Sequence, residues 1–284
     1  MKQGMKELIR EACPPMIWKA AGQLKRGASA KLTERGDRDG AELARLAGLP
    51  KFAHTTARLL DRELIVTDAQ SFVSIYWAYF GREDYQFRAS CENPLILDCG
   101  ANVGLGVRYW KQLYPHARVT AFEPDPESFA ALQENTRDLS DVILRQEAVW
   151  SQSGPMSFAA LGADGGHLTA VSPDRLLSNE LVVPATRLRD HLVEPVELLK
   201  LDIEGAEVDV LLDCRDRLPL VRNLFVEYHS FSGQPQRLQA FFGAIEEAGF
   251  RVHTHPDVPA PQPFLSRPVL NGKDLRMNVF CFRE

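Results

Sequence analysis

The sequence predicts an α/β fold: a mostly parallel sheet with helices on both faces and an antiparallel hairpin at its end. From Leu95 onward, short apolar runs alternate with stretches of helical character, which is the pattern of successive strand–helix units. Near the end of the chain two apolar runs, 251–255 and 277–282, are joined by a proline-rich stretch instead of a helix. Consecutive strands of this kind pair antiparallel.

The expected core begins with the strand LILDCG at residues 95–100. Further strands are expected at 118–125, 141–150, 197–205, 222–230, 251–255 and 277–282. Helices are expected at 103–113, 126–138, 206–212 and 235–248. Between Gly154 and Val183 the alternation pauses, and we interpret this stretch as an inserted β-hairpin or loop.

Two domains are expected. Residues 1–54 look helical and polar and form an N-terminal helical extension. Residues 55–284 form the second domain, in which 55–94 precede the core at 95–284. Within 55–94 we expect a β-hairpin around Asp61-Arg62 and then an aromatic-rich segment that begins as a helix.

The composition argues against several classes of partner, metal site and cellular location. A formal net charge of −5 gives no basic footprint, which argues against nucleic acid as a partner. Five widely spaced cysteines without a C-x-x-C pair argue against structural zinc and fit a reducing compartment. No apolar run has the length of a membrane span or a signal peptide, so we expect a cytoplasmic protein. The sequence does not indicate an oligomeric state.

The turn after the first core strand predicts a ligand site, because ligands of such sheets bind beyond the carboxyl ends of the strands. Its glycines, at 100, 104 and 106, do not have the G-x-G-x-x-G spacing that seats a dinucleotide. Asp98 would repel a diphosphate but suits a ligand with a cationic amino group, such as S-adenosylmethionine. The carboxylate of that ligand could bind turn N–H groups or the amide of Asn102.

The next two strands offer further contacts to a nucleoside. Glu123, followed by Pro124, lies one strand–helix step after Asp98, where an acid accepts the hydroxyls of a ribose. The same holds for NAD, so Glu123 alone does not discriminate between the two ligands. Glu147 and Ala148, at the end of the third strand, are candidates to hold the adenine.

The segments LILDCGANVGLG, AFEPDPESFAALQENT, LLKLDIEGAE and LFVEYH together resemble the FkbM family of methyltransferases, over about residues 55–284. The resemblance implies a class I, Rossmann-like methyltransferase fold with a seven-stranded sheet and S-adenosylmethionine as donor. It also implies methylation mostly of hydroxyl groups, often on sugars or natural-product intermediates. Matching motif positions imply contacts to the methionine part of the donor from Asp98, Gly100, Asn102 and Gly104, and to the ribose from Glu123. Cys99 departs mildly from the family pattern and is expected to be a packed thiol.

A hydroxyl acceptor must lose a proton, which calls for a general base. Glu227 and His229 share a face of the fifth strand because they are two residues apart. His229 is the preferred base, oriented by Glu227 or by Asp202, which follows the fourth strand and is also a donor contact. Alternatively, Glu227 and His229 only brace the strand ends as a buried pair.

The same three residues could bind magnesium, but histidine is a poor magnesium ligand, so a metal is not favoured. Glu204 is a candidate contact to the acceptor, together with His167 of the insertion and Tyr76 of the aromatic segment. Glu207 is expected to stabilise the dipole of the helix that it begins.

We therefore expect an O-methyltransferase acting on a small molecule. The rivals are N- or C-methylation of a peptide or metabolite, an NAD(P)-dependent oxidoreductase, and a non-catalytic module that keeps the fold. The glycine spacing argues against the oxidoreductase. The acids and the histidine at the strand ends argue against the non-catalytic module.

Overall fold

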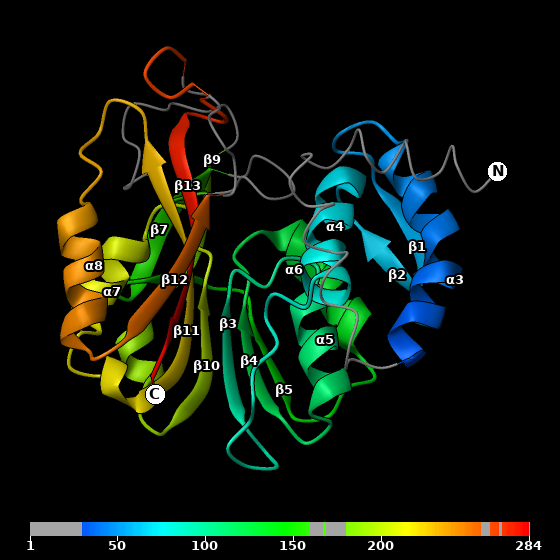
Figure 1. The fold of residues 1–284 in the computed structure, drawn as a ribbon, viewed down its shortest axis with the longest axis horizontal. Coiled ribbons are helices and arrows are strands. Elements are labelled where there is room, and N and C mark those ends of the chain that lie inside the picture. The colour runs from blue at the N-terminus through cyan, green and yellow to red at the C-terminus, as the bar shows by residue number, and fades with distance from the viewer. Residues whose placement is uncertain (1–29, 160–166, 169–179, 257–261, 267–268, 284) are drawn as a thin grey trace. The chain divides into compact units, whose positions relative to one another are not determined.

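The computed structural model describes residues 30–159, 167–168, 180–256, 262–266 and 269–283 (Figure 1). The chain forms two compact units, of which the first ends at Gln86 and the second spans Phe87–Glu284. The predicted division into domains at residue 54 remains a prediction. Within the first unit, the predicted hairpin packs against the helix before it, and the following helix does the same.

The first unit contains helix α3 (Ala30–Ala47), the hairpin β1 (Thr55–Leu59) and β2 (Arg62–Val66), helix α4 (Ala69–Tyr76) and a π-helical turn (Trp77–Gly81). The predicted hairpin and helix are thus confirmed. The turn falls at Leu60-Asp61, one residue before the expected position, and both residues have positive φ, at 56° and 60°. Such a two-residue turn matches the twist of the paired strands.

The second unit is built on a seven-stranded sheet in the order β12-β13-β11-β10-β3-β4-β5. Its strands are β3 (Leu95–Cys99), β4 (Arg118–Phe122), β5 (Val142–Arg145), β10 (Val196–Leu201), β11 (Val221–Phe231), β12 (Arg251–Pro256) and β13 (Lys273–Phe282). β13 pairs antiparallel with both β11 and β12, and the other pairs are parallel. The predicted fold class, including the terminal antiparallel hairpin, is confirmed.

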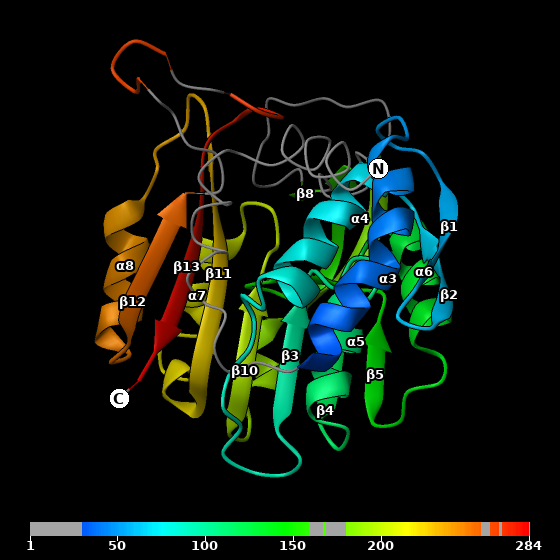
Figure 2. The same ribbon diagram turned by 45° about the vertical axis from the view of Figure 1, so that its right-hand side comes forward.

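The helices of this unit are α5 (Leu105–Leu113), α6 (Pro126–Thr136), α7 (Glu207–Asp213) and α8 (Leu238–Glu247), with 3₁₀ turns at Leu188–His191 and Leu218–Leu220. The chain moves outward from β3 to β5 and, later, outward from β10 in the opposite direction. Right-handed crossovers therefore place α5 and α6 on one face of the sheet and α7 and α8 on the other (Figure 2). The point of reversal, between β3 and β10, is where ligands bind in such sheets.

The third predicted strand, 141–150, is corrected by the structure. The chain leaves the main sheet after β5, and β6 (Ala148–Trp150) pairs with β9 (Glu180–Arg187) in a second sheet. β7 (Gly154–Ala159) and β8 (His167–Leu168) complete this sheet in the order β6-β9-β7-β8. The predicted insertion therefore contains a hairpin, β7–β8, but within a four-stranded sheet. Ala148, Val183 and Ala185 form a small apolar core there, which explains why the apolar run continues past the break.

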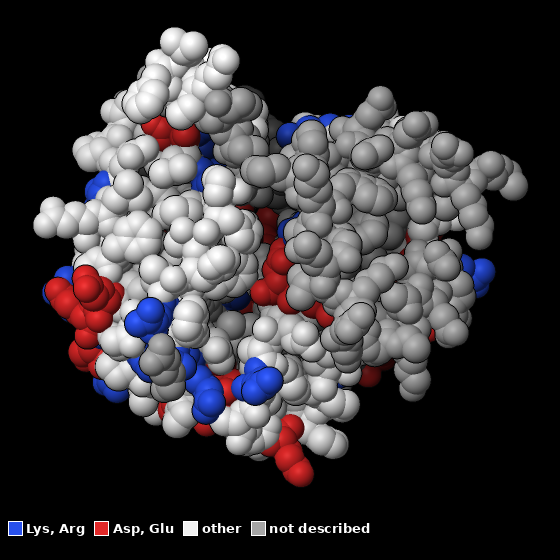
Figure 3. Space-filling model, viewed as in Figure 1, with Lys and Arg blue, Asp and Glu red and all other residues white. Residues whose placement is uncertain are grey.

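The main sheet carries the larger core, and Cys99 is fully buried in it. Burial raises the pKa of the Cys99 thiol well above its ordinary value, as expected for a packed thiol. No helix in the described part of the chain has the length and apolar character needed to cross a membrane. Acidic and basic side chains both occur on the face drawn in Figure 3.

Candidate active site

The loop after β3 is held by backbone contacts. Gly100 and Ala101 both donate their N–H to the carbonyl oxygen of Phe122, at 3.0 and 2.9 Å. Gly100 has a φ of 88°, and a Cβ at this position would overlap the carbonyl oxygen of Asp202. Glycine is required here because two strand ends, those of β3 and β10, approach each other at backbone distance.

Gly104 has a different function. It begins helix α5 with a φ of 88°, and a Cβ there would lie 2.7 Å from Cδ1 of Leu132 on α6. This glycine therefore allows two helices to pack closely. Asn102 also has positive φ, at 48°, and its side-chain oxygen accepts from the N–H of Val103 at 2.7 Å. The predicted contacts of both residues to a donor remain predictions.

Glu123, at the end of β4, is buried and faces this loop. Its carboxylate accepts from the N–H groups of Asn102, at 2.8 Å, and Asp125, at 2.9 Å. Burial raises the pKa of Glu123 to about 7, although both backbone hydrogen bonds act to lower it. A carboxylate has about four lone-pair positions, so this one can still accept from hydroxyl groups. Pro124, half-buried, follows directly.

Asp98 has a buried cationic neighbour that the sequence does not predict. Lys200 lies opposite Asp98 in the register of β10 and β3, with Nζ 3.3 Å from Oδ1 of Asp98. The same Nζ donates to the carbonyl oxygen of Gly100 at 2.8 Å and lies 3.5 Å from Oδ2 of Asp202. Burial raises the pKa of Asp98, and Lys200 opposes this shift. Lys200 therefore links the two strand ends electrostatically.

Glu147 and Ala148 lie at the break between the two sheets. Glu147 is half-buried and pairs with Arg145, with 3.6 Å between Oε1 and Nη1. Ala148 is buried and pairs with Ala185. The contact of Glu147 and Ala148 to an adenine remains a prediction.

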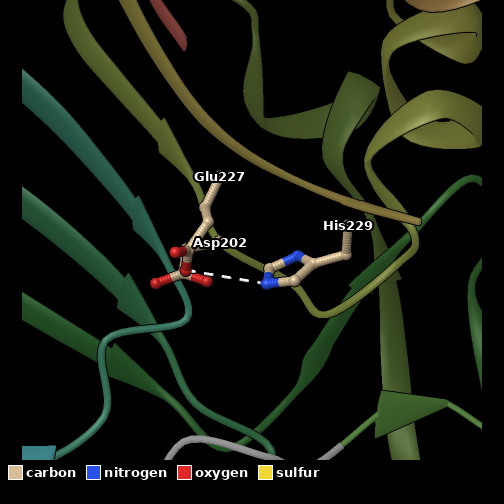
Figure 4. A group of neighbouring side chains, drawn as sticks. All are labelled: Asp202, Glu227 and His229. Carbon is tan, nitrogen blue, oxygen red and sulfur yellow. Dashed lines mark ion pairs between the residues drawn. The ribbon is translucent and has the colours of Figure 1, made fainter. Parts of the chain in front are cut away.

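A cluster of acids and one histidine lies at the neighbouring strand ends. Asp202 follows β10 directly, and Glu227 and His229 alternate along β11. One ligand-type atom from each of the three lies within 4.8 Å of the others. Figure 4 shows the imidazole of His229 directed toward the two carboxylates, with Nε2 3.6 Å from Oε2 of Glu227. The expectation that Glu227 and His229 point together is therefore confirmed.

His229 is oriented by Glu207, which corrects the predicted choice of Glu227 or Asp202. Its Nδ1 lies 2.9 Å from Oε1 of Glu207, and that oxygen also accepts from the N–H groups of Ile203 and Gly205. Glu207 is fully buried, so it does more than stabilise a helix dipole. Burial alone would lower the pKa of His229, but Glu204, Glu207 and Glu227 raise it to about 10.

Accessibility separates the roles in this cluster. The side chain of His229 is 0% exposed, whereas those of Asp202 and Glu227 are 28% and 18% exposed. A bound molecule can therefore contact the two carboxylates, with the imidazole behind them. Burial would raise the pKa of Asp202, but the cationic neighbours Lys200, His229 and Lys273 lower it, so its carboxylate is ionised at neutral pH.

Three further predicted contacts differ in their surroundings. Glu204 is paired with Lys273, and its Oε2 lies 3.7 Å from Nε2 of His229, so it borders the cluster. Tyr76 belongs to the first unit, where its buried hydroxyl donates to Oδ2 of Asp39 at 2.6 Å. His167 lies in β8, where its backbone pairs with Ala159 of β7, and its side chain lies outside the described residues.

A family model described as the methyltransferase FkbM domain matches residues 98–252 of the chain. Methyltransferase sdnD of Sordaria araneosa is similar, with 29% identity over 237 residues, and the match covers 67% of this chain and 89% of that protein. The 2-O-methyltransferase NoeI of Sinorhizobium fredii is 30% identical over 155 residues, covering 48% of this chain and 63% of that protein.

The 31-O-demethyl-FK506 methyltransferase FkbM of Streptomyces tacrolimicus is 29% identical over 174 residues. That match covers 49% of this chain and 66% of the relative. The chain thus spans less than two thirds of both NoeI and the FK506 enzyme. The matched segment 98–252 contains the loop after β3, Glu123 and the acid–histidine cluster.

Proposed function

The chain belongs to the FkbM family of methyltransferases, and from this premise we propose that it uses S-adenosylmethionine to methylate a hydroxyl group of a small molecule, such as a sugar or a natural-product intermediate. One observation carries the proposal. Glu123 is a buried carboxylate at the strand end where a ribose is expected to bind. At neighbouring strand ends of the same sheet lie two accessible carboxylates, those of Asp202 and Glu227. We call the ends of β3 and β4 the donor edge and the ends of β10 and β11 the acceptor edge.

The residues of the donor edge fit the proposed donor. Glu123 has lone pairs left for the ribose hydroxyls, after accepting two backbone hydrogen bonds. The loop carrying Gly100, Asn102 and Gly104 would hold the methionine part, with Asp98 behind it, and Glu147 and Ala148 would flank the adenine. When bound, S-adenosylmethionine supplies a methyl group already activated on a sulfonium. The protein therefore has to position the two partners and to remove one proton.

At the acceptor edge, Asp202 and Glu227 are the groups that an acceptor hydroxyl can reach. We assign Glu227 as the base that receives the hydroxyl proton and Asp202 as the carboxylate that orients the hydroxyl. His229 becomes a positioning residue, because its side chain is fully covered and Glu207 fixes its ring. This replaces the direct role that the sequence suggests for His229.

The names of two relatives support oxygen as the methylated atom, since NoeI is named a 2-O-methyltransferase and the FK506 enzyme is named for a 31-O-demethyl acceptor. The free thiols of all four described cysteines support a cytoplasmic, reducing location.

The test is mass spectrometry of candidate acceptors incubated with the full chain and S-adenosylmethionine. The panel contains sugars and hydroxylated natural products beside amine analogues of the same skeleton. We expect a mass gain of one methylene on a hydroxyl compound and none on its amine analogue. Methylation of the amines alone would contradict the proposed acceptor class. Absence of any calorimetric signal on titrating the donor into the chain would contradict the proposal as a whole.

A further inference from the structure

The acceptor edge brings together three side chains of the kinds that bind metal ions. Asp202 and Glu227 each offer a carboxylate oxygen and His229 offers Nε2, and these atoms all lie within 4.8 Å of one another. The residues come from the ends of two adjacent parallel strands, so rigid elements hold them in place. The distances are those of groups that share a small space, close enough to converge on one ion.

A second observation points to a ligand. Nε2 of His229 is buried and has no hydrogen-bond partner among the residues that the structure describes, and it is directed at the two carboxylates (Figure 4). A buried polar atom without a hydrogen bond is costly, so it calls for an explanation. Lys273 does not supply one, because its ammonium group pairs with Glu204.

The other ring nitrogen has the partner that metal-binding histidines usually have. Nδ1 lies 2.9 Å from the carboxylate of Glu207, which two backbone N–H groups hold in turn. When an ion displaces the proton of Nε2 while Nδ1–H donates to this carboxylate, the lone pair of Nε2 points toward Asp202 and Glu227. This carboxylate–histidine arrangement fixes both the tautomer and the ring orientation that a metal ion requires.

We propose that Asp202, Glu227 and His229 bind a divalent first-row transition-metal ion, with Mn²⁺ as the representative, and that Glu207 orients the histidine ligand. Two carboxylates with one imidazole suit such ions better than magnesium, which prefers oxygen ligands alone. Three protein ligands leave coordination positions open for other molecules.

This inference rests on the proposed function. An ion in this position lowers the pKa of a hydroxyl that binds beside it, so the proton can pass to the neighbouring carboxylate oxygen of Glu227 at neutral pH. A carboxylate alone is a weak base for an alcohol. The ion would therefore make the hydroxyl acidic enough for a carboxylate of the acceptor edge to take its proton.

The experiment uses the full chain, stripped with a chelator and titrated with Mn²⁺ while electron paramagnetic resonance measures the free ion. We expect one bound ion per chain, and pulsed measurements should show nitrogen coupling from an imidazole. Asp202→Asn and Glu227→Gln should each weaken binding at least about tenfold, and Glu207→Gln should weaken it by about 10- to 100-fold. Glu194→Gln, which changes an exposed carboxylate paired with Arg118, is the matched control and should bind as the wild type does.

Two results would overturn the inference: no saturable binding of Mn²⁺ to the wild-type chain, or binding without nitrogen coupling that persists in both ligand variants. The nitrogen coupling is read on the wild type, so a variant that fails to fold does not remove the test. The proposed function is judged separately, by donor titration into chelator-treated chain. Donor binding without Mn²⁺ binding would refute the metal site alone, and Mn²⁺ binding without donor binding would refute the proposed function alone.

Discussion

The donor edge and the acceptor edge of the same sheet are built by different means. At the donor edge, backbone N–H groups bind the Glu123 carboxylate and glycine permits the close approach of Gly100 to Asp202. At the acceptor edge, side chains neutralise one another: Glu207 holds His229, and Lys273 holds Glu204. The first arrangement is held by the backbone and is suited to fixing the shape of a binding site. The second consists of ionisable side chains, which can interact with a charged or proton-donating ligand. Binding and chemistry should therefore be separable by mutation.

The largest effect is expected at the acceptor edge. Glu227→Gln keeps the shape of the side chain but removes the proposed base, so turnover should fall by about 10²- to 10⁴-fold. The measurement is the initial rate with an acceptor found by mass spectrometry, together with the calorimetric Kd of the donor. A variant with wild-type turnover would show that the carboxylate has no part in proton removal.

Next in size is the loss of Glu207. Glu207→Ala removes the acceptors of two backbone N–H groups and leaves the buried His229 without its partner, so the free energy of unfolding should fall by about 3 kcal/mol. Urea unfolding gives this value. The control is Asp209→Ala in the same helix, where the ion pair with Arg237 is exposed and the loss should be about 1 kcal/mol or less. Equal losses in the two variants would mean that Glu207 does not anchor the acceptor edge.

A smaller effect is expected where the two edges touch. Gly100→Ala forces a Cβ onto the carbonyl oxygen of Asp202 at a positive φ, which should cost about 2 kcal/mol of unfolding free energy. Gly243→Ala is the control, because that helical glycine has open space around it, and it should be neutral or stabilising by about 1 kcal/mol. A Gly100→Ala chain as stable as wild type would argue against the backbone contact between the edges.

The pH dependence of Glu123 gives the smallest effect. Because burial raises its pKa to about 7, the carboxylate that accepts ribose hydroxyls is lost below that pH. Donor affinity should then weaken by about tenfold for each pH unit below 7. Calorimetry from about pH 5.5 to about pH 8 measures this, with Glu123→Gln as the control that should lack this dependence. A wild-type affinity that is constant over this range would contradict the role of Glu123.

The stability of the free chain should respond to Glu123 in the opposite sense. The folded-state pKa lies above the ordinary glutamate pKa of 4.5, so the folded chain binds this proton more tightly than the unfolded chain does. The contribution of Glu123 to stability is present below pH 4.5 and is lost as pH rises through about 7. Acidification should thus weaken donor binding while this residue stabilises the fold.

The two edges also differ in how far the sequence predicts them. The glycines and Glu123 follow strands in a local pattern, so their positions could be expected from spacing alone. The shared face of Glu227 and His229 follows from the two-residue period of a strand. Lys200 and Glu207 could not be assigned in this way, because their partners, Asp98 and His229, lie far away along the chain.

The sequence nevertheless contains one indication that Lys200 has a charged partner. A lysine within the apolar strand VELLKL must be paired if the strand is buried in a parallel sheet. The break between β5 and β6 is not indicated by a turn residue, since the stretch from Val142 to Trp150 contains neither glycine nor proline. The pairing of β6 with β9, which begins with Ala148 opposite Ala185, shows where one sheet ends and the other begins.

The central claim is that the donor edge binds S-adenosylmethionine independently of the acceptor edge. Calorimetric titration of the donor into the wild-type, Glu123→Gln and Glu227→Gln chains tests it without knowledge of the acceptor. We expect binding to the wild type, a loss of about tenfold or more in Glu123→Gln, and affinity close to wild type in Glu227→Gln. Failure of the wild type to bind, or equal affinities in wild type and Glu123→Gln, would contradict the claim.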